Sequence, residues 1–400
     1  MNILYIWDAD YPWDIRVDKI TSSLRSVGYN VHIAARNLKG LPKKNEVNGI
    51  FIHRLRSYEN QRINYFLSFP FFFNPFWLRL LNKIVKENAI ELIIVRDLPL
   101  APAGIIIAKI FSLPVIFDMA ENYVAFLKEM RMHSKIIGLN LLVRNPFLAK
   151  LVEIYVFANT DHSFVVVEEA KNILINAGVN INRISIVSNT PLMSLLENHE
   201  KIHIDNVHGE LIRNRYSAIY AGGLQKGRGL QTVFEAMPAI IEKIPDFLFV
   251  IIGDGYSVDF FKEMVQKKGI EGYVLWVGWV EHNDLYAYIK DSKIGLIPHF
   301  VSEHVNTTIP NKLFDYMAME LPVIVTDAVP LARIVQEEKC GFSYKSGDSS
   351  DLQRAIVKLH GAELSFGMNG KRAIKRKYNW ERDEKELLCA IKLFEKNKSS

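Results

Sequence analysis

Residues 217–230 read SAIYAGGLQKGRGL, an apolar run that ends in a glycine-rich turn and continues into a helix-length segment. The run 217–221 predicts a buried strand, and the turn predicts a helix that starts directly after it. Glycines let the backbone approach a phosphate there, and the N–H groups of a helix N-terminus favour an anion. The stretch therefore predicts a strand–turn–helix unit with an anion site at its turn.

Short apolar runs alternate with amphipathic, helix-length stretches on both sides of this unit. That order is typical of parallel, doubly wound α/β sheets. The expected strands of the first half are 2–7, 31–35, 91–95, 114–117 and 162–167, with helices at 15–27, 100–111, 135–158 and 168–177. The expected strands of the second half are 217–221, 247–252, 274–277, 293–297 and 323–326.

The periodicity fails between 188 and 215, which divides the chain into two domains. We expect a Rossmann-like domain at 1–190, a linker at 191–215, a second Rossmann-like domain at 216–370 and a basic helix at 371–400 that crosses back to the first domain. Two facing domains of this kind place their ligand loops along a shared cleft.

Composition restricts the functional class. The chain has 400 residues, 49% of them hydrophobic, a net charge of +5 and two cysteines, Cys340 and Cys389. Two cysteines make no disulfide framework and suit a reducing cytoplasm, and residues 1–14 lack the basic start of a signal peptide. The basic excess is confined to the first 190 residues; it is too small for a nucleic-acid binder but suits an anionic membrane surface or acceptor.

Residues 65–81, YFLSFPFFFNPFWLRLL, are rich in Phe and Leu. Pro70 and Pro75 interrupt the run, which is too short for a transmembrane helix. Two interpretations stay open: a loop and helix packed on the sheet, or an anchor at the inner face of the membrane with an aromatic surface and flanking cations.

A second ligand-binding pattern is residues 306–324, NTTIPNKLFDYMAMELPVI. Pro310 suits the first turn of a helix, and Thr307 and Thr308 suit its cap. The helix N-terminus would then present N–H groups to the donor site. Asp315, if it faces that site, is a good acceptor for vicinal hydroxyls, and otherwise it only favours the helix dipole.

With these residues in hand, the chain resembles the retaining nucleotide-sugar glycosyltransferases of family four, which have the two-domain GT-B fold. It resembles most the subgroup with a Pro-Asn/Ser-Lys-Leu-Phe-Asp/Glu-Tyr donor-site helix. The matching motifs are 11–31, VSNTP at 187–191, 222–230, IGDG at 252–255, VGWV at 277–280, IPH at 297–299, PNKLFDYMAMELPVIVTD at 310–327 and KYNW at 377–380.

The resemblance implies a hexosyltransferase-like enzyme that moves a sugar, with retained configuration, from a nucleoside diphosphate sugar to a glycan or lipid-linked acceptor. Such transfer serves cell-surface polysaccharide or glycoconjugate synthesis and implies no cofactor, no metal and no nucleic acid. The donor-binding residues implied are Gly222, Gly223, Lys226, Arg228, Gly253, His299, Thr307, Thr308, Asn311, Lys312 and Asp315. A structural hydrogen-bonding role is the alternative for His299.

The first domain departs from the family pattern at Ala120, where many members carry His in an Asp-x-His motif. Asp118 or Glu121 takes that place, and Arg16 is the expected cleft-facing charge on the acceptor side. The catalytic residues implied are Lys226, Asp315 and Glu121. Retention is expected to use the leaving diphosphate itself, so that the protein positions the reactants and stabilises developing charge.

Alternatives remain for the metal and for the activity. Residues 199–203, HEKIH, match a zinc-protease pattern but lie in the polar linker, and residues 8–10, Asp-Ala-Asp, are interpreted as a loop. A nucleotide-sugar epimerase shares the fold, and a catalytically silent nucleotide-sugar-binding scaffold would lack turnover. The nucleotide base, the sugar and the acceptor are not predicted.

Overall fold

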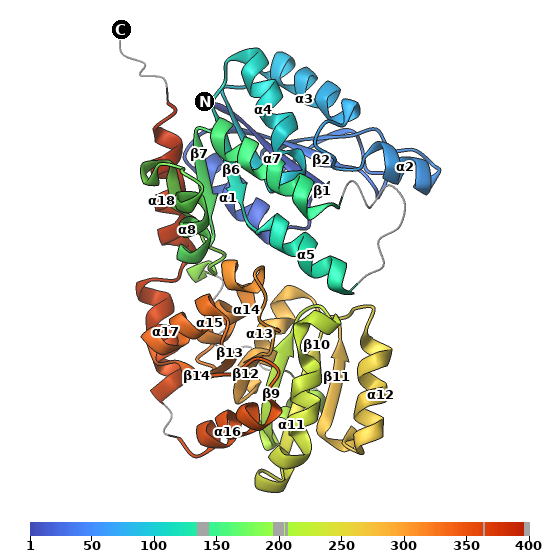
Figure 1. Ribbon diagram of the computed structural model, residues 1–400, viewed down its shortest axis with the longest axis vertical. Helices are drawn as coiled ribbons and strands as arrows, with labels where there is room; N and C mark the ends of the chain where they lie inside the picture. The colour runs from blue at the N-terminus through green and yellow to red at the C-terminus, as the bar shows by residue number, and fades with distance from the viewer. Residues whose placement is uncertain (134–143, 195–203, 205–206, 363–364, 396–400) are drawn as a thin grey trace. The chain divides into compact units, whose positions relative to one another are not determined.

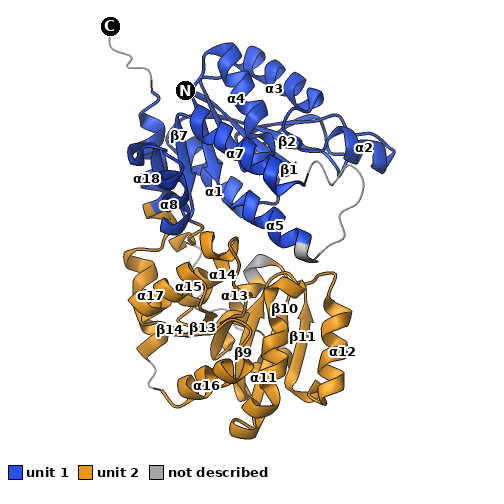
Figure 2. Cartoon of the chain, viewed as in Figure 1, with its two compact units in different colours: residues 1–188, 383–400 blue, residues 189–382 orange. Residues whose placement is uncertain are grey.

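The chain divides into two compact units, which are described separately (Figure 2). Unit 1 contains residues 1–188 and 383–400, and unit 2 contains residues 189–382. The computed structural model describes residues 1–133, 144–194, 204, 207–362 and 365–395. Each unit is an α/β layer structure with its own sheet, which confirms the predicted fold class.

Unit 1 contains an eight-stranded sheet in the order β3-β4-β2-β1-β5-β6-β7-β8 (Figure 1). Every neighbouring pair is parallel except β3 and β4, which form an antiparallel edge. The strands are β1 (Asn2–Asp10), β2 (Asn30–Arg36), β3 (Lys44–Val47), β4 (Ile50–Arg54), β5 (Leu92–Arg96), β6 (Val115–Met119), β7 (His162–Val165) and β8 (Ile184–Ile186). The strands β3, β4 and β8 were not predicted.

The helices of unit 1 cover this sheet. They are α1 (Ile15–Ser26), α2 (Gln61–Leu67), α3 (Pro75–Asn88), α4 (Ala101–Phe111), α5 (Tyr123–His133), α7 (Pro146–Asn159) and α8 (Glu168–Asn176). Polar side chains cap four of them: Asp14 caps α1, Asn60 caps α2, Asn74 caps α3 and Asn145 caps α7. The predicted helix at 135–158 begins later than expected, because the Asn145 side chain accepts the N–H groups of Phe147 and Leu148 and caps α7 there. Residues 134–143 lie outside the described part of the chain.

Unit 2 contains a six-stranded, fully parallel sheet in the order β11-β10-β9-β12-β13-β14. Its strands are β9 (Tyr216–Ala221), β10 (Phe247–Ile252), β11 (Val274–Gly278), β12 (Ile294–Ile297), β13 (Val323–Thr326) and β14 (Gly341–Tyr344). Its helices are α10 (Val207–Asn214), α11 (Leu230–Lys243), α12 (Val258–Lys268), α13 (His282–Asp291), α14 (Asn311–Ala318), α15 (Val329–Glu338), α16 (Ser349–His360) and α17 (Ser365–Arg376).

Two segments differ from the sequence expectation. Helix α10 forms inside the predicted linker, since Ile212 is buried and Arg213 Nη1 lies 2.7 Å from Asp291 Oδ2. The predicted C-terminal helix is two helices, α17 and α18 (Trp380–Lys392), because the Asn379 side chain donates to the Ile374 carbonyl at the end of α17. Residues from 383 onward cluster with unit 1, as the predicted return of the chain requires.

The aromatic segment 65–81 contributes to α2 and α3 and the turn between them. Trp77 is fully buried and its Nε1 donates to the Ser68 carbonyl, and Phe72 is also buried. Phe66, Phe73 and Phe76 remain exposed, so both interpretations of the segment find support in different side chains. No helix among the described residues is long and apolar enough to cross a bilayer.

Buried histidines make the stability of unit 1 depend on pH. His32 on β2 and His53 on β4 have Nδ1 and Nε2 3.1 Å apart, and both rings are buried. Burial, and next the charge of His32, lower the pKa of His53 to about 4. Burial and Arg183 lower the pKa of His162 on β7 to about 4.

We predict that His53 and His162 each lower the stability of unit 1 as the pH falls from about 6.5 to about 4. In that window each histidine binds a proton in the unfolded chain but not in the folded chain, which costs about 2 kcal/mol per histidine. Asp8 and Asp97, whose pKa values are raised in the folded chain, contribute in the opposite direction. Urea unfolding between pH 7.5 and 4.5 compares the variants, and His53→Gln together with His162→Gln should lose less stability than wild type on acidification. The same change at exposed His360 is the control; equal slopes for both variants and wild type would contradict the account.

Candidate functional site

The glycine-rich turn of unit 2 lies at the carboxyl end of β9, against the turn that follows β10. The Gly222 N–H donates to the Ile252 carbonyl at 2.9 Å, and the Gly253 N–H donates to the Gly278 carbonyl at 2.8 Å. A Cβ on Gly253, whose φ is 126°, would lie 2.1 Å from the Gly222 carbonyl oxygen. Only glycine therefore allows these two turns to approach each other.

A cationic cluster stands directly above this turn. Lys312 Nζ lies 3.4 Å from His299 Nε2 and 4.0 Å from the ring centroid of Tyr220. A Cβ on Gly222 would lie 2.7 Å from Lys312 Nζ, so this glycine leaves room for the ammonium. Arg228 belongs to the same group, since its charge acts on both His299 and Lys312.

The electrostatics of the cluster favour an anionic ligand. Burial, and after it the charge of Arg228, hold the pKa of Lys312 well below its ordinary value. Burial and Lys312 likewise hold the pKa of His299 well below its ordinary value, while Asp315 acts on Lys312 in the opposite direction. A bound anion would supply negative charge and raise both pKa values, so its binding is coupled to proton uptake.

Asp315 is fixed near this cluster by the packing of α14. The Tyr286 hydroxyl donates to Asp315 Oδ1 at 3.3 Å, and the carboxylate is almost fully buried. The next residue, Tyr316, accepts the Ala221 N–H on its hydroxyl at 3.0 Å, which ties α14 to the end of β9. The sequence pattern did not identify Tyr220 or Tyr286 as members of the site, because both look like core aromatics.

Lys226 and Arg228 occupy different surroundings within one turn. Lys226 is exposed, and its Nζ lies 4.1 Å from the ring centroid of Phe260 on α12. Arg228 is half-buried, and its Nε lies 3.4 Å from Gln225 Oε1. The structure thus places Arg228, rather than Lys226, beside His299 and Lys312.

The expected cap of α14 is wrong. Pro310 occupies the cap position, and no side chain caps the helix. The Thr307 hydroxyl donates instead to the carbonyls of Glu303 and His304, at 2.9 and 3.1 Å. Thr308 is half-buried beside it, and Asn311 is the exposed first residue of the helix.

In unit 1, Arg16 and Asp118 form a buried ion pair. Arg16 Nη2 lies 2.5 Å from Asp118 Oδ1, and Arg16 Nη1 donates to the Val187 carbonyl at 2.8 Å. The Tyr5 hydroxyl donates to Asp118 Oδ2 at 2.7 Å. Arg16, expected as a cleft-facing charge on the acceptor side, is buried and paired with Asp118, which is also buried.

A second group of carboxyls lies at the carboxyl ends of β1, β5 and β6. Asp97 Oδ1 accepts the N–H groups of Ala120 and Glu121, each at 3.1 Å, and the Glu121 side chain is exposed beside it. Burial, partly offset by Arg96, raises the pKa of Asp97 to about 8. Burial likewise raises the pKa of Asp8 to about 6. The interpretation of residues 8–10 as a loop is wrong, because they belong to β1, and the sequence motifs did not identify Asp97, which directly follows β5.

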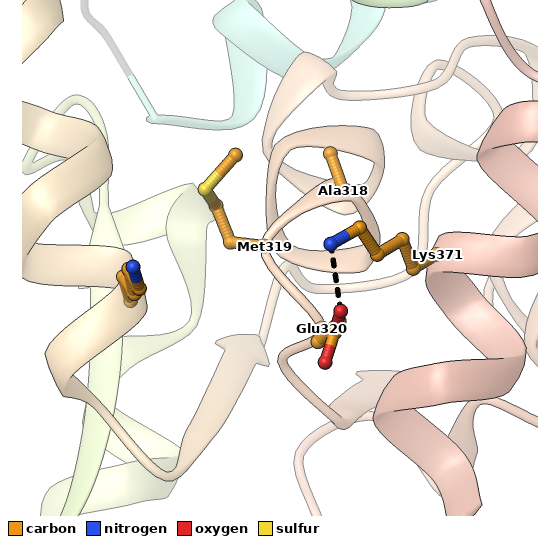
Figure 3. Close-up of a pocket in the computed structure, with 5 residues that line it drawn as sticks. Ala318, Met319, Glu320 and Lys371 are labelled. Atoms are coloured by element: carbon orange, nitrogen blue, oxygen red, sulfur yellow. Dashed lines mark hydrogen bonds and ion pairs between the residues drawn. The ribbon is translucent and has the colours of Figure 1, made fainter. Parts of the chain in front are cut away.

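A hollow lies at the opposite end of α14 from the cationic cluster (Figure 3). Ala318, Met319, Glu320, Lys290 and Lys371 line it, and Lys371 Nζ lies 2.7 Å from Glu320 Oε1. Lys371 is thus paired with Glu320, and we assign the hollow no ligand. Among the described residues, no three His, Cys, Asp or Glu side chains are grouped to hold a metal ion; residues 199–203 lie outside them.

Sequence comparison identifies the central part of unit 2. Residues 215–361 match the family described as Glycosyl transferases group 1. An uncharacterized glycosyltransferase of Methanocaldococcus jannaschii is 22% identical over 394 residues, covering 96% of this chain and 94% of the relative. A phosphatidyl-myo-inositol mannosyltransferase of Mycobacterium leprae is 23% identical over 38% of this chain and 40% of its own.

A third relative and two solved structures extend the comparison. The amylovoran biosynthesis glycosyltransferase AmsK of Erwinia amylovora is 23% identical over 35% of each chain. Sucrose-phosphate synthase of Thermosynechococcus elongatus superposes with a TM-score of 0.78 over 98% of both chains at 16% identity. HepE of Anabaena, solved with UDP-glucose, gives 0.72 over 98% and 100% at 12% identity. The chain therefore has a GT-B-like fold.

We predict that Arg228→Gln weakens the binding of inorganic pyrophosphate about tenfold, whereas Lys226→Gln changes it about threefold or less. Arg228 acts electrostatically on Lys312 and His299, whereas water screens the charge of the exposed Lys226. Calorimetric titration of both variants and wild type measures the ratio. The reverse order would show that Lys226 swings in to contact the anion.

We also predict that Asp118→Asn destabilises unit 1 by about 3 kcal/mol, because it leaves the buried Arg16 guanidinium without its countercharge. Glu121→Gln, three residues further along the chain and exposed, is the matched control and should change the free energy of unfolding by about 0.5 kcal/mol or less. Urea unfolding measures both. Equal stability of the two variants would mean that water reaches Arg16.

Proposed function

We propose that the chain is a retaining glycosyltransferase that moves a hexose from a nucleoside diphosphate sugar to a glycan or lipid-linked acceptor. The observation that carries this proposal is the cluster of Arg228, Lys312 and His299 above the Gly222 turn, with Asp315 on the adjoining helix. Basic side chains beside a glycine turn match a diphosphate, and a carboxylate near them matches vicinal ribose hydroxyls.

The donor would be held by unit 2 in the following way. Arg228, Lys312 and His299 contact the diphosphate, with the turn at Gly222, Gly223 and Gly253 beneath it and the start of α14, Thr307–Lys312, at the sugar. Lys226 adds charge at the rim. Asp315 binds the ribose, which makes it a positioning residue for the nucleotide.

The same cluster suits the departure of the diphosphate from the sugar. As the bond from the sugar to the diphosphate breaks, negative charge grows on the leaving oxygen, and pre-placed cations stabilise that charge. A bound anion raises the lowered pKa of Lys312 and so favours its charged form. Retention follows if the leaving oxygen accepts the proton of an acceptor hydroxyl on the same face, which asks for no metal and no enzymic base.

The acceptor would contact unit 1 through carboxyl groups. Asp8, Asp97 and Glu121 supply such groups at three neighbouring strand ends. Arg16 and Asp118 act beneath them by fixing β6 and the start of α1. We assign Glu121 the direct contact, because its side chain is exposed.

The relatives support the cellular setting of the proposal. One carries a name in amylovoran biosynthesis and another in phosphatidyl-myo-inositol mannosylation, so polysaccharide and glycolipid synthesis are the processes we propose here. The HepE complex makes a uridine diphosphate sugar the first donor to test. We place the enzyme in the cytoplasm at the inner face of the membrane, with the exposed Phe66, Phe73 and Phe76 of segment 65–81 toward lipid.

We predict that one of UDP, GDP, ADP and CMP binds the wild type, and that Lys312→Met and Asp315→Asn weaken that nucleotide about tenfold or more. Glu121→Gln should bind it normally and lose transfer. The matching α-linked donor is then followed by proton NMR, and slow hydrolysis should release the α-anomer first. Release of the β-anomer would contradict retention, and binding without hydrolysis or transfer would support the silent scaffold.

A further inference from the structure

Helix α7 carries an apolar stripe that no described part of the chain covers. Phe147 is 70% exposed, Leu151 and Ile154 are each 52% exposed, and Tyr155 is 36% exposed. Their spacing of four, three and one residues places them on one side of the helix, while Ala149, Glu153, Val156 and Phe157 face the core. A continuous stripe of four large side chains is unusual on a surface that meets only water.

The exposed charged side chains that α7 itself and Lys109 on α4 place beside this stripe are positive. The one acidic residue of α7, Glu153, is buried and its Oε2 lies 2.6 Å from Lys150 Nζ, so the outward face of the helix presents no carboxylate. Lys109 on α4 lies over the ring of Tyr155, at 5.5 Å, and donates to Asn159 Oδ1. Next to Lys109, Ile110 is 63% exposed and widens the apolar area.

Helix α3 adds a basic surface to the same layer. Helix α3 packs on α4, and α4 packs on α7 (Figure 1). The exposed side chains of α3 include Arg79, Lys83 and Lys86, and its one exposed acid, Glu87, is paired with Lys83 and Lys44. An apolar stripe bordered by lysines and arginines is the composition that binds the headgroup region of an anionic bilayer.

We propose that the α7 stripe, with Ile110 and the cations of α3 and α4, is a second membrane contact that seats unit 1 on an anionic lipid surface. This membrane contact extends the proposed function. It depends on that function only in assuming that the acceptor is linked to lipid. It is distinct from segment 65–81, because α7 is a separate helix with its own exposed side chains. Tyr155 and Phe147 would lie at the interface, with Lys109 and Lys150 among the headgroups.

Flotation of the full chain with vesicles tests the surface directly. Wild type should float with vesicles of phosphatidylglycerol and phosphatidylethanolamine and stay unbound with pure phosphatidylcholine. Leu151→Gln with Ile154→Gln should lower the partition coefficient about tenfold or more, and Arg79→Glu with Lys86→Glu should lower it while making it insensitive to 0.5 M salt. Phe147→Ser, at the exposed first turn of α7, is the second variant in case the double variant does not fold.

The matched control removes equally exposed apolar side chains elsewhere on unit 1. Val27→Gln with Ile181→Gln, which are 50% and 54% exposed in wild type, should float like wild type. Flotation of the α7 variants at the wild-type level overturns the proposal, and so does a change from oligomer to monomer in those variants, which would make the stripe an interface between copies. Nucleotide binding by unit 2 is measured on the same variants, so failure of the membrane contact is separable from failure of the proposed transfer.

Discussion

The close approach of Lys312 to His299, above a turn that only glycine can form, is the constraint on which the candidate donor site depends, and the charge of Arg228 acts on both side chains. Three nitrogen-bearing side chains are held together with one carboxylate, Asp315, near them. Like charges in a partly desolvated place repel, so the arrangement costs free energy until an anion arrives. The arrangement lowers the stability of the fold, but it holds the basic side chains in place before a diphosphate binds. Such electrostatic preorganisation stabilises the charge that develops during group transfer.

The parallel sheet of unit 2 makes that arrangement possible. The turns after β9 and β10 touch through Gly222 and Gly253, and α14 is tied to β9 by the Tyr316 hydroxyl. Each tie joins residues far apart in sequence at one edge of the sheet, where the carboxyl ends of parallel strands gather ligand loops. In unit 1, the central charged side chains at this edge, Arg16 and Asp118, form an ion pair with each other. Burial raises the pKa values of Asp8 and Asp97 at the same edge.

Much of the fold could be predicted from the sequence, because buried parallel strands are continuous apolar runs and glycine-rich turns mark their ends. The edge strands β3 and β14 are short and partly exposed, so no continuous apolar run in the sequence predicted them. The sequence named Lys312 and Gly222 as members of one candidate site, and the structure places Lys312 Nζ against Gly222. It could not rank Lys226 against Arg228, since two residues along a turn reverse the direction of a side chain, nor show that Arg16 and Asp118, 102 residues apart, neutralise each other.

Proton uptake on nucleotide binding tests the central claim most directly. Titration calorimetry of UDP, or of whichever nucleoside diphosphate binds, in two buffers of different ionisation enthalpy gives the number of protons exchanged. At pH 8 the account predicts net uptake, because the anion raises the lowered pKa values of Lys312 and His299, and it predicts that Lys312→Met reduces the uptake and weakens binding. Binding without proton exchange, at equal affinity in wild type and Lys312→Met, would contradict the account.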